Sequence, residues 1–430
     1  MGVSRLIRSR AAIWVGFGLV HAWLTVVGVV IAPQTSFNDV DLYRWWMHLG
    51  LAEGQWPVLD APWVYPAGAV APMLLPGLAG TVSTAGYALG WCLLVTLLDG
   101  LATAALLRER PDGSRTTTGA WWWLAFLVAL GPVALGRLDG IVVPLMVLAL
   151  LAGVGRPRLA AALMAVGAWI KVAPGALLLP LVAAVRRPVR DVVVPALVVC
   201  GVVVGAVTAG GGIGNIASFL TVQTARGLQV ESVTATPWVV ASLWRDDVVI
   251  RLNDVLITWE VVGPGTTTAA AALDMALALA VGLVAGLLWW ARTQGRSVAA
   301  LVPGAFLTLI VVVVVNKVGS PQLLAWLAAP VAVMLGGPTA AGARWLRAVA
   351  TTTLAAAALT QVVFPWGYLR LLGGSGSITA ILVLRNLLLV ALVALAVVGL
   401  LRAARADDSD DWPEDWPDDS PEAVQGGGGG

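Results

Sequence analysis

The first two acidic residues of the chain lie close together in the sequence NDVDLY, residues 38–43. Asp39 and Asp41 come soon after a long apolar run. A carboxylate at such a place can act as a general base that removes a proton from a hydroxyl group. It can equally be part of a helix start, with Asn38 as the N-cap and both carboxylates favoured by the positive end of the helix dipole. Spacing alone leaves both interpretations open.

Lysine is rare in this chain and lies in unusual places. Of 26 basic residues only Lys171, in WIKVAPG, and Lys317, in VVVVVNKVGSPQ, are lysines. An ionisable group at the centre of a membrane span costs on the order of 3 kcal/mol, so each is a candidate functional residue. The alternative is snorkelling, in which the stem lies in lipid and the ammonium group reaches the interface.

Two short polar segments could contribute to the same chemistry. Arg226 and Glu231, in RGLQVESV, can bind a phosphate or a sugar hydroxyl, or can simply be solvated in a loop. Arg137 and Asp139, in GRLDG, form a turn between two apolar runs and can pair with each other.

The composition identifies the chain as a polytopic membrane protein, which we expect to be all-α. Of 430 residues, 59% are hydrophobic and 12% are charged, about half the charged share of a soluble domain. Apolar runs near the length of about 20 residues that crosses a bilayer recur from residue 11 to residue 401. The first run is long for a signal peptide and is followed by Pro33, which favours an uncleaved span. Cys92 and Cys200 lie in such runs and are interpreted as buried thiols.

Arginine-rich turns predict the topology, because basic loops stay on the cytoplasmic side. We expect a bundle of about twelve spans in residues 1–405, a plasma-membrane location and both termini in the cytoplasm. The spans are 11–32, 85–107, 120–136, 140–154, 158–171, 174–187, 190–209, 269–291, 297–315, 321–336, 344–364 and 377–401. The first outer loop, 33–84, contains an amphipathic helix over 39–53 and a juxtamembrane helix over 66–80. Residues 210–268 form a longer outer loop.

The charge is distributed unevenly along the chain. Residues 406–430 contain nine acids and no bases, whereas residues 1–405 have 26 bases and 15 acids. The excess is a topology signal rather than a nucleic-acid footprint, since the arginines lie at the ends of apolar runs. We expect the tail to be disordered and cytoplasmic, either as a docking segment for a partner protein or as a solvated tail.

The predicted topology brings basic and acidic groups from distant parts of the chain to one face. They are Asp39, Asp41, Arg137, Asp139, Lys171, Arg226, Glu231, Asn316 and Lys317. Carboxylates and cations around one vestibule suit a substrate that has a phosphate and a hydroxyl nucleophile. Nucleotide-loop and zinc motifs are absent from the sequence, and no metal is expected.

Several of these segments resemble the GT-C superfamily of polytopic glycosyltransferases. The likeness rests on the outer Asp-x-Asp in NDVDLY, the aromatic helix after it and the step WVYPAGAVAPMLLP. WIKVAPG, RGLQVESV and NKVGSPQ resemble the segments Lys-x-x-Pro, Arg-Gly-x-Gln-x-Glu-Ser and Lys-x-x-Ser-Pro-Gln of glycosyltransferase family 87. That family consists largely of actinobacterial mannosyltransferases. The sequence VYPAG departs from the family, which more often has a second proline there.

The resemblance implies an inverting transfer of mannose from a polyprenyl-phosphate donor to a glycolipid or lipoglycan on the outer face, without a required metal. Asp39 would be the base, with Asp41 as alternate or helper. Lys171, Lys317 and Arg226 would bind the donor phosphate. The substrate-binding residues would be Tyr43, Arg137, Asp139, Gln229, Glu231, Asn316 and Gln322. The alternatives are arabinofuranosyl transfer, a transporter or flippase of lipid-linked sugars, and a structural membrane component recruited through its tail.

Overall fold

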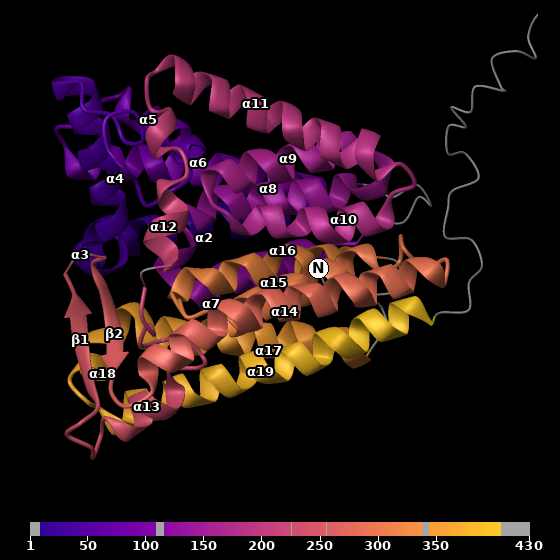
Figure 1. The fold of residues 1–430 in the computed structure, drawn as a ribbon. Coiled ribbons are helices and arrows are strands. Elements are labelled where there is room, and N and C mark those ends of the chain that lie inside the picture. The colour runs from indigo at the N-terminus through magenta and orange to yellow at the C-terminus, as the bar shows by residue number, and fades with distance from the viewer. Residues whose placement is uncertain (1–8, 109–115, 225, 255, 338–343, 406–430) are drawn as a thin grey trace, which may run out of the picture.

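The protein is a mostly helical membrane protein, as its composition predicts (Figure 1). The computed structural model describes residues 9–108, 116–224, 226–254, 256–337 and 344–405. Within that part of the chain, six helical segments are long and apolar enough to cross a membrane. They are Arg10–Ile31, Thr84–Leu106, Val189–Ala209, Thr266–Thr293, Arg344–Trp366 and Gly376–Ala404. Their main helices are α2 (Arg10–Val26), α6 (Thr84–Leu106), α11 (Val194–Ala209), α14 (Thr266–Thr293), α17 (Arg344–Gln361) and α19 (Gly376–Ala404).

Shorter apolar helices fill the remaining predicted ranges. They are α7 (Thr118–Leu130), α8 (Asp139–Ala152), α9 (Pro157–Ile170), α10 (Leu178–Ala184), α15 (Leu301–Val314) and α16 (Ala325–Gly336). A helix therefore lies in each of the twelve ranges, but six of them are too short to cross alone, and twelve crossings stay a prediction. Local chemistry explains the breaks. α9 ends at Ile170 because Lys171 is extended (φ −155°, ψ 132°) and Pro174 follows.

The short helices form the centre of the bundle. α16 packs on α7, α8 and α15, while α19 packs on α15 and α17. Nearly every residue of α8 and α16 is apolar, and these helices bury most of their circumference. α7 is also apolar but keeps one exposed face, on which Val128 is 45% exposed. Only 11% of the most apolar stretch of α11 and of α14 is buried, as a lipid-facing helix requires. α11 runs along one edge of the bundle (Figure 1).

The two ends of the bundle differ in chemistry. We call one the arginine end, where the basic turns meet: Arg10 donates to the carbonyl of Leu107, and Arg292 donates to the carbonyls of Ala183 and Val185. The other, the loop end, carries short helices and a β-hairpin (Figure 1). These helices are α3 (Pro33–Ser36), α4 (Asn38–His48), α5 (Val70–Gly77), α12 (Ser218–Thr224), α13 (Thr236–Ala241) and α18 (Tyr368–Leu372).

The predicted helix over 39–53 is confirmed as α4 and the π-helical turn that follows it. The N-cap prediction was wrong, because Phe37 is the N-cap and Asn38 is already helical. α4 buries Val40, Tyr43 and Met47 against the bundle.

The loop end also contains one short β-hairpin within this mostly helical protein. β1 (Val249–Asn253) pairs antiparallel with β2 (Thr258–Val262), from Val249 opposite Val262 to Asn253 opposite Thr258. Both strands are rich in β-branched residues, which favour a pleated surface over a helix. The predicted tail over 406–430 lies outside the described residues.

Candidate functional site

A cavity of about 1830 Å³ opens at the loop end. Its walls come from α4, the end of α9, the hairpin, α14, α18 and the loops at 226–231 and 316–322. Ten of the twelve predicted site residues line it: Asp39, Asp41, Arg137, Lys171, Arg226, Gln229, Glu231, Asn316, Lys317 and Gln322. The structure therefore brings together residues from segments that lie far apart in the sequence.

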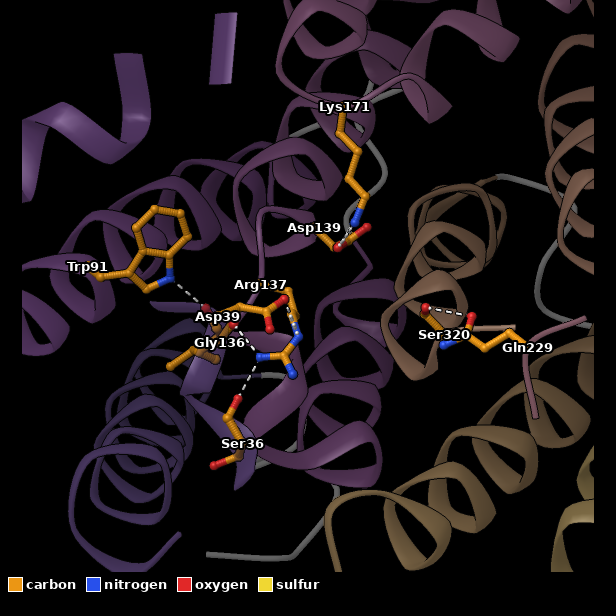
Figure 2. Close-up of polar contacts among 10 residues, drawn as sticks. Ser36, Asp39, Trp91, Gly136, Arg137, Asp139, Lys171, Gln229 and Ser320 are labelled. Carbon is orange, nitrogen blue, oxygen red and sulfur yellow. Dashed lines mark hydrogen bonds and ion pairs between the residues drawn. The ribbon is translucent and has the colours of Figure 1, made fainter. Parts of the chain in front are cut away.

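Asp39 is held by Arg137 rather than left as a free helix cap. Its Oδ2 lies 3.1 Å from Arg137 Nε, and the Asp39 side chain keeps 30% of its surface exposed (Figure 2). Arg137 is nearly buried and also donates to the carbonyls of Ser36 and Gly136, at 2.7 and 2.8 Å. The Asp39 carboxylate is therefore fixed in direction while it faces the cavity.

Asp41 has a different environment. Arg44 Nε and the Thr84 hydroxyl both donate to its Oδ1, at 2.7 and 2.9 Å. Partial burial works against the charged form, but these hydrogen bonds and the Arg44 charge outweigh it and lower the pKa of Asp41. A carboxylate with a lowered pKa is a weaker base, so the two aspartates are not equivalent.

Arg137 and Asp139 do not form the ion pair with each other that their spacing allowed: Arg137 pairs with Asp39 and Asp139 with Lys171. Asp139 is fully buried at the start of α8, and its Oδ2 lies 2.5 Å from Lys171 Nζ (Figure 2). Its other oxygen accepts a hydrogen bond from the Trp326 indole at 2.6 Å. Asp139 therefore stands behind the cavity wall and fixes Lys171, which lines the cavity.

Lys317 is paired with a residue that the sequence analysis missed. Its Nζ lies 2.9 Å from Oδ2 of Asp274, on α14, and the Asp274 side chain is 55% exposed. Asp274 is the one carboxylate in the predicted apolar span 269–291, and this signal in the sequence would have identified it as a candidate. Arg385, on α19, is a second charge of that kind.

Arg226 differs from the other basic residues that line the cavity in the described part of the chain. Arg44, Arg137, Lys171 and Lys317 each have a carboxylate within 4.0 Å, whereas Arg226 has none. Its buried Nε has no hydrogen-bond partner. Burial lowers the pKa of Arg226, although the charge of nearby Glu260 opposes this effect. Arg226 is consequently the cation best prepared to receive an anion from outside.

Gln229 connects the loop that follows Arg226 to the loop that contains Lys317. Its backbone N–H donates to the Lys317 carbonyl at 3.0 Å, and its Oε1 accepts from Gly319 N and Ser320 Oγ, at 3.0 and 3.1 Å (Figure 2). A Cβ atom at Gly319 would lie 2.2 Å from Ser232 N, so only glycine permits this approach. Asn316 accepts from Val318 N at 2.8 Å and shapes the same loop.

Glu231 forms a buried ion pair with Arg385. The Arg385 guanidinium lies 3.1 Å from Glu231 Oε2, and both side chains are at most 2% exposed. Burial raises the pKa of Glu231 to about 7, although Arg385 and Arg137 act in the opposite direction. This pair ties the 226–232 loop to α19.

Tyr43 lies outside the cavity lining. It is buried, and its ring packs edge-on against that of Tyr65, at a centroid distance of 6.1 Å; Tyr65 does line the cavity. The Tyr43 ring also contacts Trp91 at a centroid distance of 5.1 Å. Tyr43 therefore supports the wall through Tyr65.

One side of the cavity is apolar. We define the apolar wall as Leu277 and Val281 of α14, Val312 of α15, and Val172 and Ala176 beside α9. Because α14 is a candidate membrane span with a largely exposed surface, this wall adjoins the region that lipid occupies. The site thus combines paired charges with a surface suited to an alkyl chain.

No group of three or more metal-ligating His, Cys, Asp or Glu side chains occurs among the described residues. Comparisons with protein-family models, with curated proteins and with solved structures found no match to this chain.

Proposed function

We propose that this protein is an inverting glycosyltransferase that moves mannose from a polyprenyl-phosphate donor to a glycolipid or lipoglycan acceptor. The observation that supports it is a single cavity in which a fixed carboxylate, several cations and an apolar wall on a membrane helix come together. An amphiphile with an anionic headgroup matches that combination.

In this proposal Asp39 is the general base. The acceptor hydroxyl attacks the anomeric carbon as the bond from that carbon to the phosphate oxygen breaks. The bonding electrons leave on the phosphate, and the hydroxyl proton passes to the Asp39 carboxylate. Arg137 holds that carboxylate toward the cavity. Asp41 suits the role less well because Arg44 and Thr84 occupy its Oδ1 and its pKa is lowered.

The leaving phosphate needs cations, because negative charge builds up on it as the sugar departs. Among the described residues Arg226 has no carboxylate within 4.0 Å, and the Lys171 ammonium group has N–H donors besides the one that meets Asp139. Lys317 lines the same cavity. Asn316 and Gln322, which also line the cavity, supply amide groups for sugar hydroxyls. The apolar wall would accommodate the first isoprene units of the donor.

The proposed orientation of the protein in the membrane follows from the position of its basic turns. If the arginine end is cytoplasmic, the cavity faces the outer side of the plasma membrane, where a lipid donor would reach it by lateral diffusion.

A transporter or flippase of lipid-linked sugars is the alternative from another class. A transport path would carry ionisable groups through the depth of the membrane. The buried His21–Asp99 pair, at 2.9 Å, is outside the cavity lining, and the ionisable residues that line it belong to the loop end. This distribution favours the transferase.

The test is sugar transfer by the purified protein in detergent. Radiolabelled polyprenyl-phospho-mannose and the matching arabinofuranosyl donor are each incubated with extracted membrane glycolipid. Mannosyl transfer to lipid, with inversion at the anomeric carbon, is the expected result. Transfer of arabinose alone would correct the sugar. Absence of transfer from both donors, together with movement of the intact lipid across vesicle membranes, would support the transporter instead.

A further inference from the structure

The two lysines of the cavity are held by carboxylates of very different exposure. Asp139, the partner of Lys171, is fully buried and uses its second oxygen for Trp326. Asp274, the partner of Lys317, is 55% exposed. Separating Lys171 from Asp139 would leave a fully buried carboxylate unpaired. Asp274 is exposed enough to be solvated by water, so it can leave once another anion pairs with Lys317, whose side chain is 7% exposed.

Asp274 stands where the apolar wall meets the charged part of the cavity. Leu277 and Val281 follow it on α14 at i+3 and i+7, so the three residues share one face of that helix, and all three line the cavity. A chain lying on Leu277 and Val281 would bring its headgroup to the Asp274–Lys317 pair.

The backbone of Lys317 is bonded to the segment that carries Arg226. The N–H of Gln229, three residues after Arg226, donates to the Lys317 carbonyl at 3.0 Å. A lipid headgroup in this part of the cavity would contact both cations. Among the described residues Arg226 has no carboxylate within 4.0 Å and its Nε has no hydrogen-bond partner, whereas Lys317 is paired with the exposed carboxylate of Asp274.

We propose that Asp274 is a displaceable counter-ion, whose place at Lys317 is taken by the phosphate of an entering anionic lipid. An entering phosphate replaces the Asp274 carboxylate at Lys317, and Asp274 turns to water, while Asp139 stays on Lys171. An uncharged amphiphile gains no contact that offsets the loss of the Asp274–Lys317 pair, so it leaves the pair intact. The inference rests on the proposed lipid-phosphate substrate and adds a residue that competes with the phosphate and so sets how tightly it binds.

The experiment measures equilibrium binding to the purified full-length protein in detergent. The ligands are a short polyprenyl phosphate, the polyprenol of the same length and inorganic phosphate. Asp274→Asn removes the competing charge and should tighten polyprenyl phosphate binding. The gain should reach at least the about 2- to 5-fold of an exposed ion pair, because the Lys317 side chain is only 7% exposed. Asp274→Glu, the matched control, should bind like the wild type. Polyprenol binding should be equal in all three proteins.

Lys317→Met supplies the second arm of the test. It should weaken polyprenyl phosphate binding, and adding Asp274→Asn to it should change nothing further. Inorganic phosphate should bind more weakly than the lipid in every variant, because it makes no contact with Leu277 and Val281. Thermal unfolding shows whether each variant is folded, and the exposure of Asp274 predicts that its variants are.

Three outcomes would overturn the inference: unchanged or weaker lipid-phosphate binding by Asp274→Asn, an equal gain for polyprenol, or inorganic phosphate binding as tightly as the lipid. The result is separable from the proposed function. Selective binding without sugar transfer would contradict the transferase alone. Sugar transfer without any effect of Asp274→Asn on binding would contradict the counter-ion alone.

Discussion

The Asp139–Lys171 pair offers a sharp energetic test of how the site is built. Removing one partner of a fully buried ion pair costs about 3–5 kcal/mol, because the other charge stays buried. Asp139→Asn leaves the Lys171 ammonium, whose side chain is 17% exposed at the cavity. We therefore expect a loss at the low end, about 3 kcal/mol. One of the two hydrogen bonds, to Lys171 or Trp326, is weakened as well.

The reverse substitution should cost more. Lys171→Met leaves a carboxylate with no exposed surface, so we expect about 4–5 kcal/mol. The double variant, Asp139→Asn with Lys171→Met, leaves no buried charge and should recover at least 2 kcal/mol relative to the sum of the single losses.

The assay is reversible unfolding of the detergent-solubilised protein by a denaturing detergent, followed by tryptophan fluorescence. Arg245→Gln is the matched control, because the Arg245–Asp247 pair lies on the surface with both side chains 52% exposed. It should leave the unfolding free energy nearly unchanged. Additive losses in the double variant, or an Asp139→Asn loss no larger than that of the control, would refute the reasoning.

Two further predictions concern the 226–232 segment and its partners. Gly319→Ala places a methyl group 2.2 Å from Ser232 N, so the loop must move. We expect about 1–3 kcal/mol of destabilisation and impaired sugar transfer. Wild-type stability together with wild-type sugar transfer would contradict the tight contact. The raised pKa of Glu231, about 7 against an ordinary 4.5, means that the folded state binds its proton more tightly than the unfolded state. Its contribution to stability is therefore complete below pH 4.5 and is lost as the pH rises through 7. Glu231→Gln should remove that part of the decline in the thermal midpoint between pH 5 and 8, and an identical decline in both proteins would contradict the assignment.

The sequence predicted the helices and the residues of the cavity well, for a common physical reason. Apolar runs and their Gly, Pro and Arg boundaries identify helix ends. Because the chain reverses direction at each turn between spans, every second turn lies on the same side of the membrane. Residues such as Lys171 and Lys317, each just beyond a helix end, were therefore expected on the same side, and both line the cavity. Their partners could not be predicted, because Asp139 and Asp274 are brought to them by packing between separate helices.

The errors have equally specific causes. The hairpin at 249–262 consists of two five-residue strands, too short for alternation to stand out in a loop that was expected to be irregular. Arg385 was missed because it lies in the middle of a strongly apolar helix, where one charge hardly changes the mean hydropathy. Asn38 was expected as the N-cap by residue preference, whereas the preceding turn already makes Asn38 helical.

The central claim is that Asp39 removes the acceptor proton during transfer from a lipid-borne phosphate. The most direct measurement is the rate of radiolabelled mannose transfer from polyprenyl-phospho-mannose by Asp39→Asn, with Asp41→Asn as the matched control on the same helix turn. We predict a loss of about 10²- to 10⁴-fold for Asp39→Asn, the usual contribution of a general base, and a loss below about threefold for Asp41→Asn. Transfer at the wild-type rate by a folded Asp39→Asn variant would contradict the account.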